Sequence, residues 1–146
     1  MGLNLEASIG KIKLKNPVLV ASGTFGHAKE FEKFFDLRKL GAIVTKTVTL
    51  NPRLGNPPPR IVETPSGMLN AIGIENPGPD VFIEKKLPLF RKIGVPLIIS
   101  ILGHTDEQFE SLVEKFNKAE GVSALELNLS CPNLKHKVLV AQDPQA

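Results

Sequence analysis

Short apolar runs alternate with amphipathic segments along most of the chain, and this alternation limits the possible folds more than any other feature. The runs that predict strands occupy residues 17–23, 42–49, 95–102 and 122–130. Segments with apolar residues near helical spacing follow three of them, at residues 27–40, 80–94 and 105–121. Strands joined by helices form parallel sheets with right-handed crossovers. The pattern therefore predicts an α/β fold, either an open doubly wound sheet or half of a (β/α)8 barrel.

Local signals refine this prediction. Residues 3–16 alternate apolar and polar side chains around a Ser-Ile-Gly turn, which predicts a hairpin before the first parallel strand. The run at 17–23 is continuously apolar between Pro and Gly, which predicts a strand buried on both faces. Pro88 falls inside a predicted helix and should kink or divide it. Thr105 is the predicted N-cap of the helix that follows the third strand.

Length and composition exclude several classes of protein. The 146 residues suffice for one hydrophobic core, so we expect a single domain over residues 1–146. The net charge of +3 is spread through mixed Lys and Glu, which argues against nucleic-acid binding. The chain shows no signal-peptide pattern and no apolar run near the roughly 20 residues that span a bilayer, and its one cysteine excludes an intrachain disulfide. We expect a cytoplasmic protein with no membrane partner.

Polar and reactive residues gather at all the predicted strand ends, in "ASGTFG", "TKTVT", "SILGHT" and "NLSCPN". Parallel α/β folds bind ligands beyond the carboxyl ends of their strands, so we expect a site there. Lys46 interrupts a β-branched strand, where a charge is costly unless it is paired or used. It either extends to solvent at the strand end or serves as a cation for an anionic ligand or a flavin. Residues 50–79 form a connection long enough to be a lid or binding loop.

Small residues and amides near these ends have two interpretations each. Ala21, Ser22 and Gly23 form either a tight turn or a surface that a flat ligand or phosphate can approach, without the G-x-G-x-x-G spacing of a dinucleotide site. Asn70, with Gly73, Asn76, Pro77 and Gly78 after it, is typical of turns. Asn128 and Asn133 offer both a donor and an acceptor to an amide, imide or carboxylate ligand, or they are turn residues.

Cys131 is the one cysteine, and a free cysteine is usually a small buried hydrophobe. It nevertheless lies past the apolar part of its strand, before a proline, at the predicted ligand-binding face. No spacing of Cys and His predicts a metal site. His136 could pair with Cys131, while His27 and His104 follow other strand ends; each histidine is equally well explained as an ordinary surface or capping residue.

Three stretches taken together resemble a known family: "NPVLVASGTFG", "GAIVTKTVTLNPRLGNPPPRIVETPSGMLNAIGIENPG" and "ALELNLSCPN". In this order and spacing they resemble the N-terminal half of a class 1 dihydroorotate dehydrogenase, with the best match to the B-type catalytic subunit. The resemblance covers nearly the whole chain. It implies a (β/α)8 TIM barrel, of which this chain would supply about the first four βα units plus an N-terminal β-hairpin.

The resemblance also implies a reaction: dihydroorotate is oxidised to orotate in de novo pyrimidine biosynthesis, with FMN over the mouth of the barrel. Cys131 would be the base that removes the C5 proton while hydride leaves C6 for the flavin. Lys46 would touch both the flavin and the substrate carboxylate. The remaining implied substrate residues are Asn70, Ala71, Ile72, Gly73, Ile74, Asn128 and Asn133. The implied FMN residues are Ala21, Ser22, Gly23, Lys46, Thr47, Ser100 and Asn128.

Partners follow from the resemblance as well. A B-type enzyme pairs with an iron–sulfur and FAD electron-transfer subunit that passes electrons to NAD+, and we expect a homo-oligomer or heterotetramer. A complete barrel takes about 250 residues, so the chain is expected to be a fragment or one half of the enzyme. The Gly-Gly pair expected near His136 and Lys137 is missing. Two alternatives stay open: a flavin enzyme of the dihydropyrimidine dehydrogenase type, and a non-catalytic half-barrel.

Overall fold

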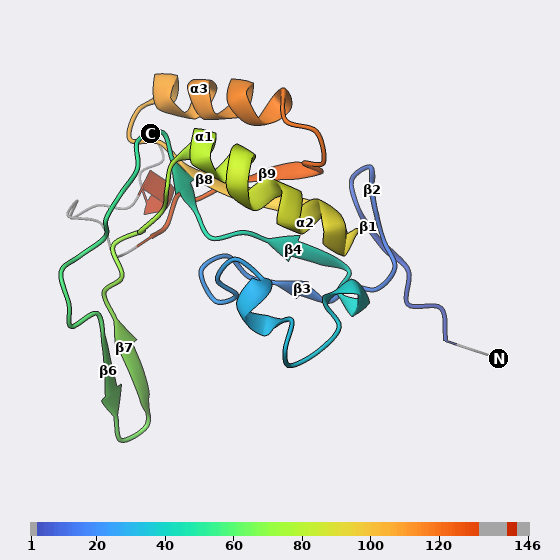
Figure 1. The fold of residues 1–146 in the computed structure, drawn as a ribbon, viewed down its shortest axis with the longest axis horizontal. Helices are drawn as coiled ribbons and strands as arrows, with labels where there is room; N and C mark the ends of the chain where they lie inside the picture. Colours follow the sequence, from blue (N-terminus) through green and yellow to red (C-terminus); the bar gives the residue numbers. More distant parts are fainter. Residues whose placement is uncertain (1–2, 132–139, 143–146) are drawn as a thin grey trace.

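A curved parallel sheet forms the centre of the computed structural model, which describes residues 3–131 and 140–142 (Figure 1). Its strands are β3 (Leu19–Val20), β4 (Ala42–Val44), β5 (Val48–Thr49), β8 (Leu97–Leu102) and β9 (Ala124–Leu127). β3 pairs with β4, β4 and β5 pair with successive parts of β8, and β9 pairs with β8 along residues 98–101. All these pairs are parallel. Sequence-adjacent parallel strands are therefore neighbours in space, which is the strand order of a barrel that has not closed.

The second predicted strand, residues 42–49, is split in two. Thr45, Lys46 and Thr47 separate β4 from β5. Side chains take over some of the cross-strand bonding there: the Ser100 N–H donates to Thr45 Oγ1 (3.3 Å), and the hydroxyls of Thr47 and Ser100 share a hydrogen bond of 2.9 Å. The strand therefore remains attached to β8 while Lys46 lies outside the regular ladder.

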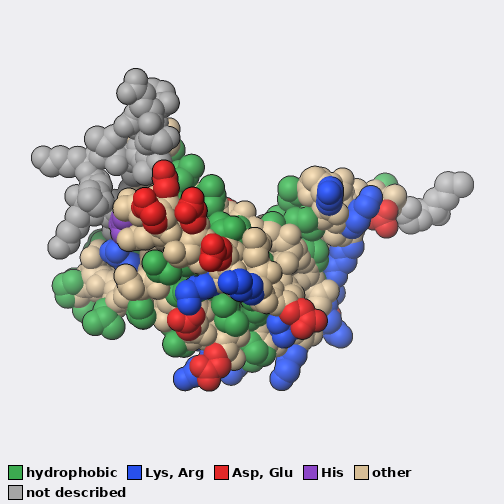
Figure 2. Space-filling view, turned by 90° about the horizontal axis from the view of Figure 1, so that it is seen from above, with side chains coloured by type: hydrophobic (Ala, Val, Ile, Leu, Met, Phe, Trp, Pro, Cys, Tyr) green, Lys and Arg blue, Asp and Glu red, His purple; other side chains and the backbone are tan. Residues whose placement is uncertain are grey.

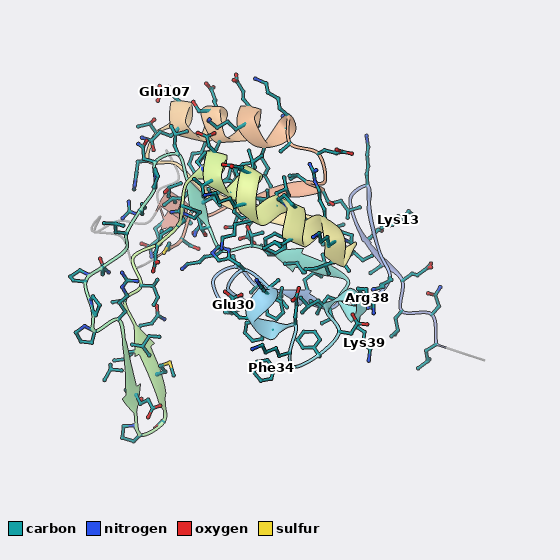
Figure 3. The ribbon with its side chains drawn as sticks, in the orientation of Figure 1. Lys13, Glu30, Phe34, Arg38, Lys39 and Glu107 are labelled. Carbon is teal, nitrogen blue, oxygen red and sulfur yellow. The ribbon has the colours of Figure 1, made fainter. Side chains whose placement is uncertain are left out.

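The α-helix predicted at 27–40 is wrong. The segment forms two 3-10 turns, η1 (Lys29–Phe31) and η2 (Leu37–Lys39). The ring of Phe31 stacks on Phe25 at 4.2 Å, and Asp36, with extended backbone, accepts from the Arg38 N–H. That Asp36–Arg38 contact lowers the pKa of Asp36. Local stacking and capping replace a continuous helix. Phe34 is left 79% exposed at the surface (Figure 3), with its ring tilted against Phe31 at 6.3 Å.

The first parallel strand also differs from its prediction. β3 contains two residues, and both are half-buried rather than buried on both faces. The hairpin predicted before it is confirmed as β1 (Ala7–Ile9) and β2 (Ile12–Leu14), which pair antiparallel. The third and fourth parallel strands are confirmed, and every residue of β8 is buried.

The helical segment after β5 is α1 (Pro79–Val81), a π-helical stretch η3 (Phe82–Lys86) and α2 (Leu87–Ile93). Pro88 lies near the start of α2, directly after the π-helical stretch, inside a run that is helical from residue 79 to 93. A proline there donates no N–H to the preceding helical turn. The helix is not broken at the proline; its geometry changes instead from π to α just before Pro88. Gly94 then ends α2 in the left-handed conformation.

Helix α3 (Asp106–Asn117) is confirmed with its N-cap, because Thr105 Oγ1 accepts from the Gln108 N–H. A hydrogen bond from the Thr105 side chain lowers the pKa of Glu107, whose charge suits the N-terminus of a helix. Figure 2 looks onto α3 from above and shows acidic side chains gathered toward the end where the helix begins. Within the described residues, no helix is long and apolar enough to cross a membrane.

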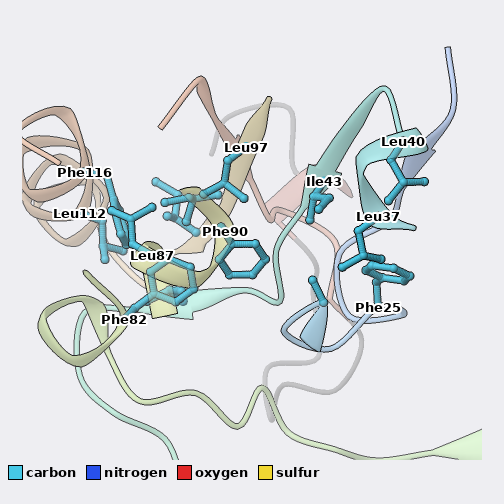
Figure 4. Close-up of a cluster of buried hydrophobic side chains, with 14 residues drawn as sticks. Phe25, Leu37, Leu40, Ile43, Phe82, Leu87, Phe90, Leu97, Leu112 and Phe116 are labelled. Carbon is cyan, nitrogen blue, oxygen red and sulfur yellow. The ribbon is translucent and has the colours of Figure 1, made fainter. Parts of the chain in front are cut away.

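The core lies between the sheet and the helices (Figure 4). Phe82 is fully buried and contacts two other rings, Phe90 at 6.0 Å and Phe116 edge-on at 5.9 Å. Leu112 of α3 and Leu87 of α2 are buried in the same cluster. This cluster holds both helices against the sheet and so fixes the strand ends that follow them.

Replacing Phe82 with Ala should lower the free energy of unfolding by about 3–5 kcal/mol, because it leaves a buried cavity beside the rings of Phe90 and Phe116. The matched control is Phe34→Ala at an exposed ring, which should change it by less than about 0.5 kcal/mol. Urea unfolding followed by circular dichroism measures both. Equal effects of the two substitutions would contradict this description of the core.

Candidate active site

A cavity of about 440 Å³ lies at the carboxyl ends of the parallel strands. Three strand ends and the connection after β5 contribute to its wall. The residues that line it are Ser22, Gly23, Thr24, Gly26, Lys46, Thr47, Asn70, Ile72, Ile74, Glu75, Asn128 and Cys131. Most of the residues proposed from the sequence are therefore brought together from segments far apart in the chain.

One wall is held by hydrogen bonds that cross three strands. Asn128, directly after β9, donates from Nδ2 to Thr47 Oγ1 at 2.9 Å. Thr47 Oγ1 is also 2.9 Å from the buried Ser100 Oγ. The amide of Asn128 and the hydroxyl of Thr47 are thereby fixed at the cavity, since each has a partner from another strand. Ser100 lies behind Thr47 and does not line the cavity.

The end of β3 forms an open, small-residue wall. Thr24 folds back on the strand end, with its hydroxyl donating to the Ala21 carbonyl at 2.8 Å. Gly23 has a φ of 79°, and a Cβ built on it would meet no atom within 4 Å. The backbone at Gly23 is therefore accessible to a flat ligand, as the sequence suggested for this turn.

The long connection at residues 50–79 is an ordered two-stranded arm rather than an irregular loop. Arg53 and Asn76 exchange backbone hydrogen bonds of 2.9 and 3.0 Å at its base. Further out, β6 (Ile61–Thr64) pairs antiparallel with β7 (Gly67–Asn70), and this hairpin projects from the molecule (Figure 1). The two sides approach so closely that a Cβ on Gly73, whose φ is 77°, would lie 2.8 Å from the Asn56 nitrogen. Only glycine fits there.

Asn76 fixes the inner end of this arm. Its side chain is 5% exposed; Nδ2 donates to Thr49 Oγ1 at 2.8 Å and to the Ile74 carbonyl at 2.9 Å. Its Oδ1 accepts from the N–H groups of Thr49 (3.1 Å) and Gly78 (3.0 Å). Ile74 has a φ of 54°, which is rare for a β-branched residue and persists only where surrounding contacts hold it. Asn76 supplies such a contact.

Lys46 and Cys131 are the reactive side chains of the cavity. Both are half-buried. Lys46 makes no ion pair with a described carboxylate, and Cys131 is a free thiol. A cation and a thiol that line one cavity can serve an anionic ligand that undergoes proton transfer.

Some residues that the sequence predicted for the site do not line this cavity. Ala21 and Ala71 are exposed and Gly73 is packed against Asn56, so none of them lines the cavity. Asn133 and His136 lie outside the described residues. His104 Nε2 is 3.4 Å from Arg53 Nη1, at the arm.

The sequence analysis missed Thr24, Gly26 and Glu75 as lining residues and the anchoring role of Asn76. Thr24 and Gly26 belong to the stretch "ASGTFG" at the end of the first strand. The prediction of a small-residue surface at residues 21–23 would have included them if it had covered the whole stretch. Asn76 shows no signal of its own in the sequence, because amides are common in any turn.

A sequence model of the family described as "Dihydroorotate dehydrogenase" matches residues 4–146. The chain belongs to this family. "Dihydroorotate dehydrogenase B (NAD(+)), catalytic subunit" of Geotalea uraniireducens is 51% identical over 144 residues, which are 98% of this chain and 47% of that protein. The protein of the same name from Thermoanaerobacter pseudethanolicus is 51% identical over 133 residues, 91% of this chain and 44% of its own length.

The fold also matches a crystal structure of DHODH from Eimeria tenella in complex with ferulenol, with a TM-score of 0.73 and 24% sequence identity. The match covers 90% of this chain and 38% of that one. The chain thus has the α/β fold of the first part of a TIM barrel, and it spans about half the length of the curated dihydroorotate dehydrogenases that it matches.

Replacing Asn76 with Ala should lower the free energy of unfolding by about 3 kcal/mol, because it leaves several buried backbone groups without partners. Hydrogen exchange at the amides of Thr49 and Gly78 should accelerate, since both donate to this side chain. The control is Asn51→Ala. Asn51 is exposed, and it accepts from the Thr49 hydroxyl through its backbone oxygen, which the substitution keeps. Unchanged exchange at Thr49 and Gly78 would contradict the anchoring role.

Proposed function

We propose that this chain supplies the first half of the active site of a B-type dihydroorotate dehydrogenase, which oxidises dihydroorotate to orotate in pyrimidine biosynthesis. One observation carries the proposal: Lys46, Cys131 and three residues of the inner arm line one cavity, the arm residues being Asn70, Ile72 and Ile74. They come from three separate parts of a chain whose relatives bear that enzyme name.

The cavity wall fits FMN. The accessible backbone at Gly23 accepts a flat ring, while the Thr47 hydroxyl, the Asn128 amide and the Lys46 ammonium suit its polar edge. We assign Ser22, Gly23, Lys46, Thr47 and Asn128 to hold it. FMN, when bound, supplies the acceptor for the hydride that leaves C6 of the substrate. Ser100 would act from behind this wall through its hydrogen bond to Thr47. Ala21 would act through its carbonyl, which accepts from Thr24 of the lining.

Substrate recognition follows from the chemistry of dihydroorotate, a small ring with a carboxylate and an imide edge. The Lys46 ammonium matches the carboxylate, and the amides of Asn70 and Asn128 can both donate to and accept from the imide. Ile72 and Ile74 provide apolar walls against the ring. Ala71 and Gly73 contribute by shaping the arm, and Asn133 remains a predicted substrate ligand.

We assign Cys131 as the base that takes the proton from C5. A thiolate is the form that accepts a proton, and general-base catalysis requires the group to reach the substrate carbon. Cys131 follows β9 and lines the same cavity as Lys46. A substrate whose carboxylate binds Lys46 would therefore lie in the cavity that the Cys131 thiol faces. The side chain is half-buried and free of any disulfide.

The partners are proposed from the relatives. Their name, "B (NAD(+)), catalytic subunit", describes one subunit of a larger enzyme that uses NAD+. We propose that this chain works with the remainder of its barrel and with an iron–sulfur and FAD electron-transfer subunit that reduces NAD+, in a homo-oligomer or heterotetramer.

In the complete protein that carries this chain, Cys131→Ala should slow flavin reduction by dihydroorotate at neutral pH by about 10²- to 10⁴-fold, the usual contribution of a general base. Orotate binding should change little, because the thiol is needed for the proton and not for affinity. Anaerobic stopped-flow absorbance measures the rate, and a flavin difference spectrum measures orotate affinity. A normal rate of reduction in the variant would exclude Cys131 as the base.

Lys46→Met should weaken orotate binding by about 10- to 100-fold, because a charge-assisted hydrogen bond to the carboxylate is lost. Binding of uracil, which has no carboxylate, is the internal control and should be nearly unchanged. The same comparison separates the proposal from a dihydropyrimidine dehydrogenase type of enzyme. Wild-type protein that oxidises dihydrouracil as well as dihydroorotate would favour that alternative.

A further inference from the structure

A second cavity, of about 380 Å³, shares Lys46 and Glu75 with the first one and is otherwise separate. His27, Arg53 and Lys86 line this second cavity and not the first. They come from the turn after β3, the base of the arm and the π-helical segment η3. Its volume is in the range of small-molecule binding pockets.

The charges around the second cavity are unbalanced. Lys46, Arg53 and Lys86 are cations, and Glu75 is the one carboxylate in the lining. Glu75 is ion-paired with Arg60, which does not line the cavity. Neither Lys46 nor Lys86, both half-buried, has an ion pair or side-chain hydrogen bond with a described residue. Three cations face one carboxylate that is already paired, so the potential in this cavity is positive and favours a bound anion.

His27 provides a second, independent observation. Its Nδ1 is the one buried side-chain nitrogen or oxygen in the described part of the chain that lacks a hydrogen-bond partner. Burial lowers the pKa of His27, and Lys86 and then Lys46 lower it further, while Glu30 and Glu75 oppose them. The ring is therefore neutral at pH 7, with a nitrogen that can donate to or accept from a ligand.

We propose that this second cavity binds a phosphate-type oxyanion, either free phosphate or the phosphate group of a nucleotide. Lys46, Lys86 and Arg53 supply the positive charge, and the His27 ring supplies one further hydrogen bond. The anion gives Lys86 its missing counter-charge and adds a partner to Lys46, which the proposed function already assigns to FMN and to the substrate carboxylate. Binding of this anion goes beyond the oxidation of dihydroorotate, because His27, Arg53 and Lys86 have no part in that reaction.

The test uses the complete protein with ¹³C-labelled histidine and NMR, with His27→Gln to assign the resonance. Titration with inorganic phosphate should give a saturable shift of the His27 signal. Phosphate should also raise the pKa of His27, because a nearby negative charge stabilises the imidazolium. Titrations with uridine monophosphate and with uridine, which lacks the phosphate group, separate the two sources. If the nucleotide shifts the His27 signal at a much lower concentration than inorganic phosphate does, the site is assigned to nucleotides.

Variants give the test its controls. Lys86→Met and Arg53→Leu should each weaken phosphate binding by about tenfold, as expected for one charge-assisted contact. Lys85→Met, at the exposed neighbour in η3, should leave binding unchanged. Glu75→Gln should strengthen phosphate binding, because it removes the one carboxylate of the lining. A misfolded variant would not bind phosphate more tightly. Absence of a saturable shift with either anion, or equal binding by the Lys86 and Lys85 variants, would overturn the proposal.

Discussion

The hydrogen bonds that join Thr47 to Ser100 and Asn128 are the interaction on which the site depends. They connect three neighbouring parallel strands: Thr47 lies where the second strand leaves its regular ladder, Ser100 lies within β8, and Asn128 directly follows β9. Because the strand is split at this point, Lys46 reaches the ligand-binding face instead of continuing a buried strand. The same bonds place the Asn128 amide at the cavity and direct the following residues, up to Cys131, along its wall. The side-chain hydrogen bonds of Thr47 therefore shape the cavity at the carboxyl ends of the strands.

The arm adds a second wall that does not belong to the barrel repeat. Its base is closed by the backbone pair of Arg53 and Asn76, and the buried amide of Asn76 ties it to Thr49 at the end of β5. This anchoring holds Ile74 in a left-handed conformation at the cavity. The free energy that maintains this conformation comes from buried hydrogen bonds outside the cavity, so the wall is formed before any ligand binds. Its position therefore depends on β5 as much as on the arm itself.

Sequence reasoning succeeded where a signal was local. A few neighbouring residues are enough to predict the buried strand β8 and the Thr105 cap of α3. A charged or reactive side chain at a strand end likewise indicated Lys46 and Cys131. It failed at 27–40, where the stacking of Phe31 on Phe25 competes with helix formation. The connection at residues 50–79 was predicted as a binding loop, but its hairpin of β6 and β7 was not. The second cavity was not predicted either, because its residues converge from distant segments. The proposed substrate and cofactor come from the family resemblance, since the same cavity residues would suit several anionic ligands.

Within the described residues β3 and β9 each pair on one side only, so each leaves an open edge that must be covered for a stable protein. The rest of the barrel would cover both edges and complete the cavity, consistent with relatives about twice as long. The most direct measurement is a crystal structure of the complete protein with FMN and orotate. The account predicts the orotate carboxylate within hydrogen-bond distance of Lys46 Nζ and its C5 facing Cys131 Sγ. Orotate bound away from these two residues would contradict it.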